Sequence, residues 1–434
     1  MTTRITIEHL ARVEGHGGVT VELQDGRVET VRFDIIEGAR LLEGLVRGRR
    51  YDEVAPIASR ICGICSAAHT LTSNLATERA FGITPSVRTE RLRDLLLRGE
   101  NIQSHALHIF LLALPDYSGA ASVLELAADQ RDVVELGLRL KRLGNTIQET
   151  VGGRAVHPVT PVVGGFTSQP SVDALLALRD ALQLGRQDAL DAVAVVAGLA
   201  RLDFGRSPTA YAALHTPGGY AYAGGHEIVV ELTGRTTTVP VPAYQSLARE
   251  HTVAHSHARH SRWNGTPFMV GALARLVVNG QHLPAIGTRA MADLGLTLPF
   301  EDPLDNTRAQ AVELCVDVAR AMDLVEQLLA DGDRADVPVP VEPRAGSGTA
   351  AIEAPRGLLV HSYEYDEHGR LARADVMTPT ALNAASVEHR LRHAAERHVS
   401  LEATELKRVL EMVVRAYDPC ISCAVHVLDL GRAP

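Results

Sequence analysis

Apolar side chains alternate with polar ones at the start of the chain, the pattern of a half-buried strand. They occupy every second position in 5–7 and again in 19–23, so we predict strands in both segments. The tetrapeptide Gln24-Asp25-Gly26-Arg27 then predicts a tight turn, because glycine adopts a positive φ at little cost. The Val- and Thr-rich segment 228–241 predicts a further strand, and 358–376 predicts a hairpin around Asp366-Glu367-His368-Gly369.

Four longer segments carry apolar residues at helical spacing. In 86–114, Leu92, Leu95 and Leu96 begin a stripe that continues to Ile109, and Pro115 is expected to end the helix. The other three helical segments are 129–150, 171–201 and 384–417. A loop is indicated by Pro338, Pro340 and Pro343. These patterns predict a mostly helical α/β chain with small antiparallel sheets and, without an obvious linker or repeat, one domain spanning 1–434.

Composition narrows the class of protein. The hydrophobic fraction of 46% suffices for one large core, and the formal charge of −9 disfavours nucleic acid or an anionic membrane as the main partner. No apolar run approaches the ~20 residues that span a bilayer, and the N-terminus lacks the features of a signal peptide. Five cysteines form an odd set, which favours a reducing compartment. We therefore expect a cytoplasmic protein without a membrane span.

Four of the five cysteines form two Cys-x-x-Cys pairs near opposite ends of the chain, Cys62 with Cys65 and Cys420 with Cys423. If folding brings the pairs together, four thiolates make a site for a soft metal. The cysteines alone leave zinc, an iron–sulfur cluster and nickel–iron open. A zinc knuckle pair usually lies ~15–20 residues apart, far closer than here, and a thioredoxin-like dithiol needs a βαβ context that neither pair has.

Further segments, taken with the cysteine pairs in chain order, carry a specific resemblance. They are Arg12-Val13-Glu14-Gly15-His16, Glu43, Gly99-Glu100-Asn101-Ile102-Gln103-Ser104-His105-Ala106-Leu107-His108, Pro115-Asp116, Gly152-Gly153-Arg154-Ala155-Val156-His157-Pro158, Glu353-Ala354-Pro355-Arg356-Gly357 and Thr378-Pro379-Thr380. Over almost its whole length the chain resembles the large (alpha) subunit of nickel–iron hydrogenases. The resemblance implies that family's large-subunit fold, with a central helical bundle, and reversible heterolytic cleavage of H2.

The resemblance also assigns roles around a Ni–Fe(CN)2(CO) centre. Cys62 and Cys420 are implied as terminal nickel ligands, and Cys65 and Cys423 as ligands that bridge to iron. Glu14 is implied to relay a proton from the Cys420 sulfur. Arg356 is implied to overhang the metals, and a carboxylate pair from Asp116 and Asp418 would suit its planar fork. Pro355 and Thr380 are implied beside the diatomic ligands, with the Thr380 hydroxyl donating to a cyanide.

A second metal and several partners follow from the same resemblance. Glu43 and His426 match ligands of a buried Mg2+ or Fe2+. Electrons must leave through an iron–sulfur small subunit, because this chain has no cysteines left for a cluster. The resemblance is to the cytoplasmic NAD(P)-linked and sulfhydrogenase branch, which implies flavin- and NAD(P)-binding diaphorase-type subunits. A branch that feeds heterodisulfide reductase, a hydrogen sensor, and a non-catalytic subunit related to complex I or holding structural zinc are the alternatives.

Maturation is also implied. Residues 427–434 resemble a short propeptide that a maturation protease removes after nickel-insertion factors have loaded the site. An intact mass ending at His426 on active protein is the expected observation.

Three other features suggest no function from sequence. The four histidines His251, His255, His257 and His260 are expected on an exposed helix, with no thiol or carboxylate to complete a metal site. The run from Gly346 to Ala351 mimics a dinucleotide fingerprint, but Pro355 follows too soon for the required helix. Cys315 is expected to be a buried apolar residue.

Overall fold

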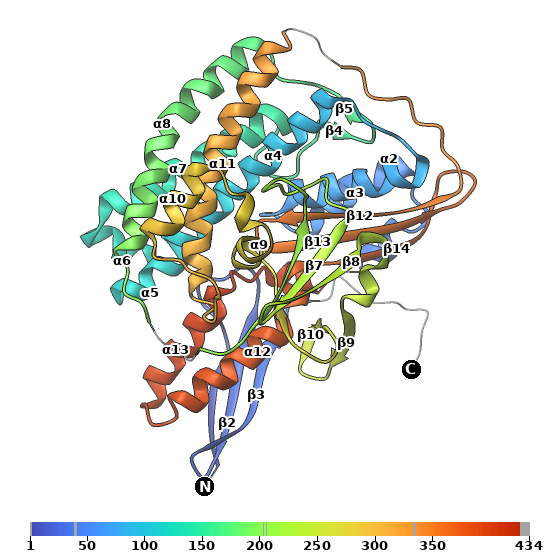
Figure 1. Ribbon diagram of the computed structural model, residues 1–434. Helices are drawn as coiled ribbons and strands as arrows, with labels where there is room; N and C mark the ends of the chain where they lie inside the picture. Colours follow the sequence, from blue (N-terminus) through green and yellow to red (C-terminus); the bar gives the residue numbers. More distant parts are fainter. Residues whose placement is uncertain (1, 39–40, 203, 205, 333–335, 426–434) are drawn as a thin grey trace.

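Four long helices pack together into a bundle that forms one side of the molecule (Figure 1). The computed structural model describes residues 2–38, 41–202, 204, 206–332 and 336–425. The bundle helices are α4 (Val87–Ala106), α7 (Arg131–Gly152), α8 (Val172–Ala197) and α11 (Asp305–Ala330). Small sheets and shorter helices make up the remainder, which confirms the predicted helical α/β class with a central bundle.

The first predicted helix does not end at Pro115. α4 continues without interruption into a π-helical segment (Leu107–Ala113) and then α5 (Leu114–Ser118). Pro115 lies in the first turn of α5, and the helical path passes through it. The helical path ends at Gly119, whose φ of 77° is readily adopted by glycine. α6 (Val123–Asp129) then leads into α7.

The N-terminal strands form an antiparallel sheet in the order β1 (Thr2–Ile7), β2 (Gly17–Gln24) and β3 (Arg27–Ile35). The predicted turn at Asp25-Gly26 joins β2 to β3, and both residues have positive φ. The long loop between β1 and β2 holds Glu14. Helix α12 (Pro379–Arg397) packs against β3.

A second antiparallel sheet has the order β12 (Gly346–Ala354), β13 (Gly357–Tyr365) and β14 (Leu371–Met377). This arrangement confirms the hairpin predicted for 358–376. It also places the glycine run at 346–351 on a strand, so no dinucleotide-binding loop forms there. Helix α3 (Ser66–Phe81) packs against β12 and β13, and α1 (Leu42–Val46) and α2 (Tyr51–Ala58) lie nearby in the chain.

Two predicted elements are each divided in the structure. The segment 228–241 is a hairpin of β7 (Glu227–Leu232) and β8 (Arg235–Pro240), because Thr233 and Gly234 adopt positive φ and reverse the chain. The segment 384–417 comprises most of α12 and all of α13 (Ala403–Ala416), which pack against each other. The apolar stripe continues across the break, so the pattern alone did not reveal it.

The remaining elements complete the middle of the chain. β6 (Ala210–His215) pairs antiparallel with β7 and parallel with β11 (Phe268–Met269). β9 (Arg249–Val253) and β10 (Ser256–Arg262) form a separate hairpin. The shorter elements are β4 (Pro161–Val162), β5 (Gly165–Phe166), α9 (Ala272–Asn279), α10 (Ala285–Asp293) and α14 (Ile421–Ala424).

No single helix of the described residues is long and apolar enough to cross a membrane. One bent pair, Val87–Ser118 with Val123–Asp129, meets the requirement of length and composition only when its two parts are taken together.

Candidate metal centre

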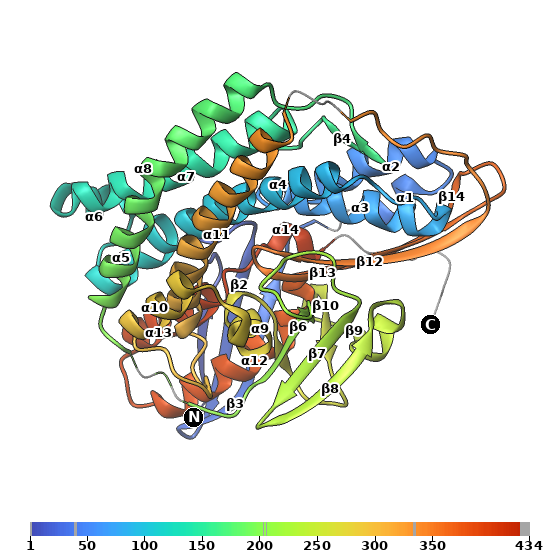
Figure 2. The same cartoon turned by 45° about the horizontal axis from the view of Figure 1, so that its top comes forward.

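The two cysteine pairs meet in the interior, where α14 lies close to the start of α3 (Figure 2). Cys62 and Cys65 occupy the turn that leads into α3. Cys420 is the residue before α14, and Cys423 lies within that helix. The sulfur of Cys420 lies 3.0 Å from those of both Cys62 and Cys423, and Cys65 Sγ lies 3.3 Å from Cys423 Sγ. The sequence prediction that the pairs converge is therefore realised.

The donor set fits a soft metal ion. All four thiols are buried, and their sulfur atoms lie within 4.8 Å of one another. Burial raises the pKa of Cys420 to about 11, whereas at Cys62 the effect of burial is outweighed by hydrogen bonds from the other three thiols, which lower its pKa. The protein alone thus favours one thiolate among thiols, and a bound cation is needed to hold all four as thiolates.

Glu14 lies directly against this cluster. The backbone of Glu14 forms an isolated parallel β-bridge with the backbone of Cys420. The Glu14 side-chain oxygen Oε2 accepts from Cys420 Sγ at 3.2 Å. The backbone N–H of Ser422 donates to Oε2 at 3.1 Å, and the Ser422 hydroxyl donates to Oε1. Gly15 permits this approach, because a Cβ at that position would lie 2.7 Å from the Cβ of Ile421. The carboxylate is thereby fixed against the sulfur.

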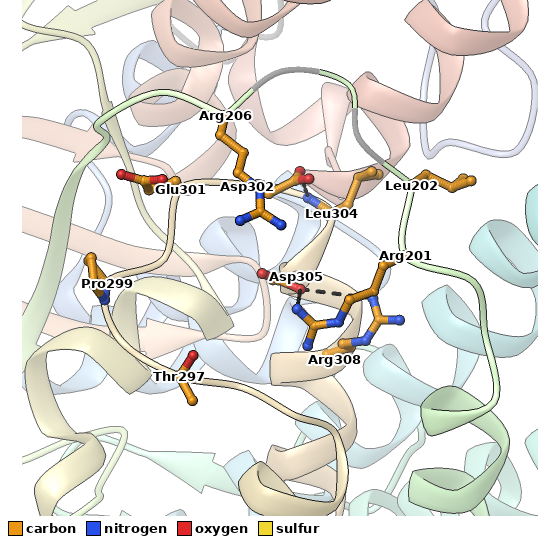
Figure 3. Close-up of a pocket in the computed structure, with 10 residues that line it drawn as sticks. All are labelled: Arg201, Leu202, Arg206, Thr297, Pro299, Glu301, Asp302, Leu304, Asp305 and Arg308. Carbon is orange, nitrogen blue, oxygen red and sulfur yellow. Dashed lines mark hydrogen bonds and ion pairs between the residues drawn. The ribbon is translucent and has the colours of Figure 1, made fainter.

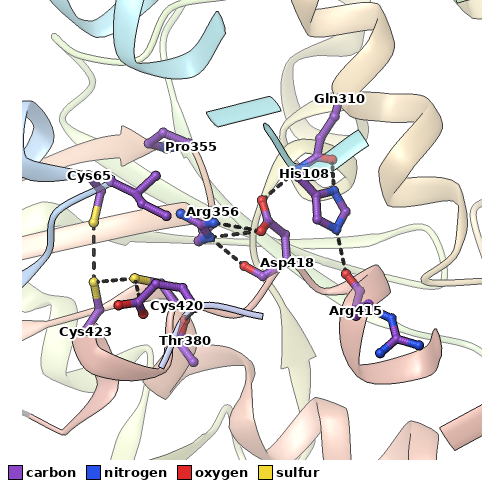
Figure 4. Close-up of polar contacts among 12 residues, drawn as sticks. Cys65, His108, Gln310, Pro355, Arg356, Thr380, Arg415, Asp418, Cys420 and Cys423 are labelled. Carbon is purple, nitrogen blue, oxygen red and sulfur yellow. Dashed lines mark hydrogen bonds and ion pairs between the residues drawn. The ribbon is translucent and has the colours of Figure 1, made fainter. Parts of the chain in front are cut away.

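Arg356 lies between the cysteines and Asp418 (Figure 4). Its Nε donates to the Asp418 backbone oxygen at 2.8 Å, and its Nη2 donates to Oδ1 at 2.8 Å. Asp418 has a φ of 48°, which turns its carbonyl and carboxylate toward the same guanidinium. Burial alone would raise the pKa of Asp418, but the Arg356 charge outweighs it and holds that pKa below its usual value.

One nitrogen of Arg356 remains available to the site. Both residues of the pair are almost fully buried, yet among the described residues Nη1 has no hydrogen-bond partner. Burial would lower the pKa of the guanidinium, but Asp418 and the nearby cysteine sulfurs outweigh it and hold that pKa above its usual value. A buried cationic donor beside four thiols fits a centre that carries small ligands able to accept a hydrogen bond.

Asp116 is not placed where the prediction put it. Its carboxylate is bound by Arg415, from Nε to Oδ2 at 2.7 Å and from Nη2 to Oδ1 at 2.8 Å, and also by Nη2 of Arg12. Among the described residues Asp418 alone supplies a carboxylate to Arg356, and its other oxygen accepts from Gln310 Nε2 at 3.1 Å. The helical continuation through Pro115 carries Asp116 toward the Arg12 loop instead.

Thr380 and Pro355 both contact the loops that hold the site. The backbone N–H of Cys420 donates to Thr380 Oγ1 at 2.9 Å, which leaves the hydroxyl hydrogen free to point elsewhere. Arg275 donates to the Pro355 oxygen at 3.1 Å and to the Ala354 oxygen at 3.0 Å, immediately before Arg356.

Glu43 lies on α1, and Val376 N–H donates to its Oε1 at 2.9 Å. Burial, with a further contribution from the Asp375 carboxylate, raises the pKa of Glu43 to about 8. His426, its predicted companion, and the tail at 427–434 lie outside the described residues.

Sequence reasoning gave no role to several buried groups near the centre. Glu100 accepts from the N–H groups of Ala67 and Ala68 at the start of α3, and burial raises its pKa to about 8. Arg275 binds Glu313 and Glu353 while it holds the carbonyls before Arg356. Glu100 could have been found from sequence, because it is a charged residue within an apolar helical stripe. No pattern of the sequence identified Arg275.

The histidine segment also differs from its prediction. His251, His255, His257 and His260 lie on or between the strands of the β9–β10 hairpin, not on a helix. A carboxylate also joins them, since His255 Nε2 lies 2.5 Å from Glu388 Oε1 of α12. Cys315 is buried, as predicted.

A separate polar hollow shares no residue with the cysteine centre (Figure 3). Three arginines and three acidic residues are among its lining: Arg201, Arg206, Arg308, Glu301, Asp302 and Asp305. Arg201 and Arg308 both approach Asp305, at 3.9 and 3.8 Å. Because the positive and negative charges of this lining offset each other, the hollow favours neither an anionic nor a cationic ligand.

Comparison with known proteins places the chain in a family. The model described as nickel-dependent hydrogenase matches residues 40–146 and 230–426, and a HoxL-like model matches 4–37. These two parts include all four cysteines. The chain therefore belongs to the nickel-dependent hydrogenase family. It is a hydrogenase large subunit, an oxidoreductase whose four-cysteine cluster is the site of a nickel–iron centre.

Similar proteins lie within this family. The chain is 38% identical to the alpha chain of sulfhydrogenase 1 of Pyrococcus furiosus, over 98% of each chain. It is 30% identical to a chain of the vhc F420-non-reducing hydrogenase of Methanococcus voltae, over 100% of this chain and 96% of that one. An NAD+-reducing [NiFe]-hydrogenase in the H2-reduced state superposes with a TM-score of 0.87 at 27% identity, over 98% of this chain and 99% of that one.

Proposed function

We propose that this chain is the catalytic subunit that cleaves H2 reversibly and heterolytically, and that it passes electrons through an iron–sulfur small subunit to NAD(P) or a similar acceptor. The observation that carries the proposal is the convergence of four buried cysteine sulfurs with the Glu14 carboxylate on one side and the Arg356 guanidinium near them. We treat 1–434 as one domain built around this centre.

Four sulfurs would hold the bimetallic group, with Cys62 and Cys420 as terminal ligands and Cys65 and Cys423 as bridges. When bound, the Ni–Fe(CN)2(CO) centre supplies the Lewis acidity that no side chain offers for splitting H2. Arg356 Nη1 and the Thr380 hydroxyl are available as donors to its diatomic ligands. Asp418 keeps the Arg356 fork in one orientation, so the donor needs no rearrangement during turnover.

Glu14 would receive the proton that leaves the Cys420 sulfur. The two atoms already lie at hydrogen-bonding distance, so a proton transfer needs no movement of the backbone. The two donors from Ser422 hold the carboxylate in place against the sulfur. Glu14 is thus proposed as the first group of an outward proton path.

The partners follow from what the chain contains. Of its five cysteines only Cys315 lies outside the centre, and it is buried on α11, so any iron–sulfur cluster must be held by another subunit. We also propose flavin- and NAD(P)-binding diaphorase-type subunits and a cytoplasmic location; the NAD+-reducing relative supports a nicotinamide acceptor. The alternative is a branch that feeds heterodisulfide reductase.

We also propose a second metal site and a processed tail. Glu43 would bind Mg2+ or Fe2+ together with His426, and its buried carboxylate would be held ionised by that cation. Nickel-insertion factors and a maturation protease would act before the tail at 427–434 is removed. An active protein whose mass ends at Pro434 would exclude the processing step.

Infrared spectroscopy with metal analysis tests the main proposal on the purified complex. We expect nickel and iron near one each per large subunit, infrared bands of metal-bound carbon monoxide and cyanide, and H2 uptake with a nicotinamide acceptor. Zinc alone, or no metal, would make the chain a structural subunit. Intact bands with only trace turnover would indicate a hydrogen sensor, and reduction of heterodisulfide reductase in place of NAD(P) would indicate the alternative branch.

A further inference from the structure

Two histidines of the β9–β10 hairpin and one glutamate of α12 converge at a point away from the cysteines. One nitrogen of His255, one of His260 and one oxygen of Glu388 all lie within 4.8 Å of one another. His255 Nε2 is 2.5 Å from Glu388 Oε1, and His260 Nδ1 is 3.5 Å from Glu388 Oε2. The hairpin packs directly on α12, so the three side chains come from two elements that already touch.

Two details of the cluster are unusual for a plain hydrogen-bonded group. His260 is 1% exposed and turns its Nδ1 toward Glu388 Oε2, while its other ring nitrogen, Nε2, has no hydrogen-bond partner among the described residues. Glu388 is held in place by a second contact, since Phe33 N–H donates to its Oε1 at 3.0 Å. Glu388 is therefore a fixed carboxylate between two imidazoles, and the Nδ1 atom of the buried His260 faces it.

We propose that His255, His260 and Glu388 bind a divalent transition-metal ion, with Zn2+ as the best fit, at a site separate from the nickel–iron centre. Two imidazoles and a carboxylate suit zinc, and they leave one tetrahedral position for water. Tetrahedral zinc places its nitrogen and oxygen ligands roughly 3.3 Å apart. The two nitrogen–oxygen distances in this cluster, 2.5 Å and 3.5 Å, lie on either side of that value. Small side-chain adjustments therefore suffice to form the site.

The site has a defined structural consequence. It ties the hairpin to α12, the helix whose first turn carries Thr380 and so supports the backbone of Cys420. The ion would brace the hairpin and α12 without contributing a ligand to the cysteine centre. His257 lies between the two ligand histidines but binds the backbone oxygen of Glu37 instead, so it provides a matched control.

Zinc counting on the purified complex tests the proposal. The wild type and the His255→Ala, Glu388→Gln and His257→Ala variants are exposed to Zn2+, freed of loosely bound metal by gel filtration, and analysed for zinc, nickel and iron. We expect wild type and His257→Ala to retain one more zinc per chain than His255→Ala and Glu388→Gln, with equal nickel and iron in all four. Comparing variants cancels any zinc held at the cysteines or at Glu43.

Co2+ in place of Zn2+ gives a second measurement. We expect a visible absorption band of four- or five-coordinate Co2+ without thiolate charge-transfer intensity, present in wild type and His257→Ala and absent in His255→Ala. His255 is only partly buried near the hairpin turn, so this variant is expected to fold. Equal zinc in all four proteins, or an equal loss in His257→Ala, would overturn the proposal.

Discussion

Two buried arginine–aspartate pairs, Arg415 with Asp116 and Arg356 with Asp418, differ in whether the arginine keeps a nitrogen without a hydrogen-bond partner. Arg415 engages Asp116 through Nε and Nη2 and the Ala11 oxygen through Nη1, so each of its nitrogens has a partner. Arg356 engages Asp418 through Nε and Nη2, while its Nη1 has no hydrogen-bond partner among the described residues. The first pair fastens the loop that leads to Glu14, whereas the second presents a cationic donor toward the sulfurs. Burial and ion pairing alone thus do not distinguish a structural arginine from a functional one.

The contrast between Arg356 and Arg415 has a functional meaning only if the sulfurs near Arg356 hold the nickel–iron centre. We predict that Cys65→Ser and Cys423→Ser each abolish assembly of the nickel–iron centre, because a weakly acidic hydroxyl cannot replace a bridging thiolate. Metal analysis of the purified complex should find nickel lost and H2 uptake absent. Stoichiometric nickel with normal uptake in either variant would remove the cysteines from the centre.

The loop fastened by the Arg415 pair matters because of Glu14. We predict that Glu14→Gln keeps nickel and iron but lowers hydrogen–deuterium exchange by roughly 10²- to 10⁴-fold, because the amide keeps the shape of the side chain and one acceptor oxygen but cannot carry the proton. Ser422→Ala is the matched control: it removes one donor to the carboxylate but no carrier, and should retain most of the exchange. An unchanged exchange rate in Glu14→Gln would take that residue out of the proton path.

The two pairs are compared directly by the same substitution in each. We predict that Arg356→Lys keeps its metals but loses roughly 100-fold in turnover, about 2.7 kcal/mol, because lysine lacks the planar fork that binds Asp418 and still leaves a donor free.

Arg415→Lys should instead keep turnover within about threefold and lose roughly 1–3 kcal/mol of stability, because buried contacts to Asp116 and Ala11 are lost. Turnover and unfolding temperature of both variants decide the matter. If Arg415→Lys loses as much turnover as Arg356→Lys, the two arginines have the same role.

The smallest expected effect concerns a third buried arginine, Arg275, which binds Glu353 and holds the carbonyls before Arg356. Burial raises the pKa of Glu353 from 4.5 to about 7. Between these values the folded state binds more protons than the unfolded chain, so this residue makes stability fall as pH rises through that window. We predict that the unfolding temperature of Glu353→Gln declines less steeply from pH 4.5 to 7 than that of the wild type. The same decline in both proteins would contradict the raised pKa of Glu353.

Features that depend on local pattern were predictable from sequence, and features that depend on tertiary partners were not. The cysteine pairs, Glu14 and the Arg356–Asp418 pair all come from short motifs in a fixed order, and they converge in the structure. Asp116 was assigned the wrong arginine, because the π-helical segment before Pro115 sets the direction of the chain and has no periodic signature. Glu388 was missed for a related reason, since nothing local indicates which helix will cover a hairpin.

The meeting of Cys62 and Cys420 across 358 residues also sets a delay during synthesis. At ~5–20 residues per second, the first cysteine pair is made roughly 20–70 s before its partners exist. Throughout that interval two thiols destined for a buried centre are exposed on an incomplete chain. The complete four-sulfur centre therefore cannot form until Cys423 has been synthesised.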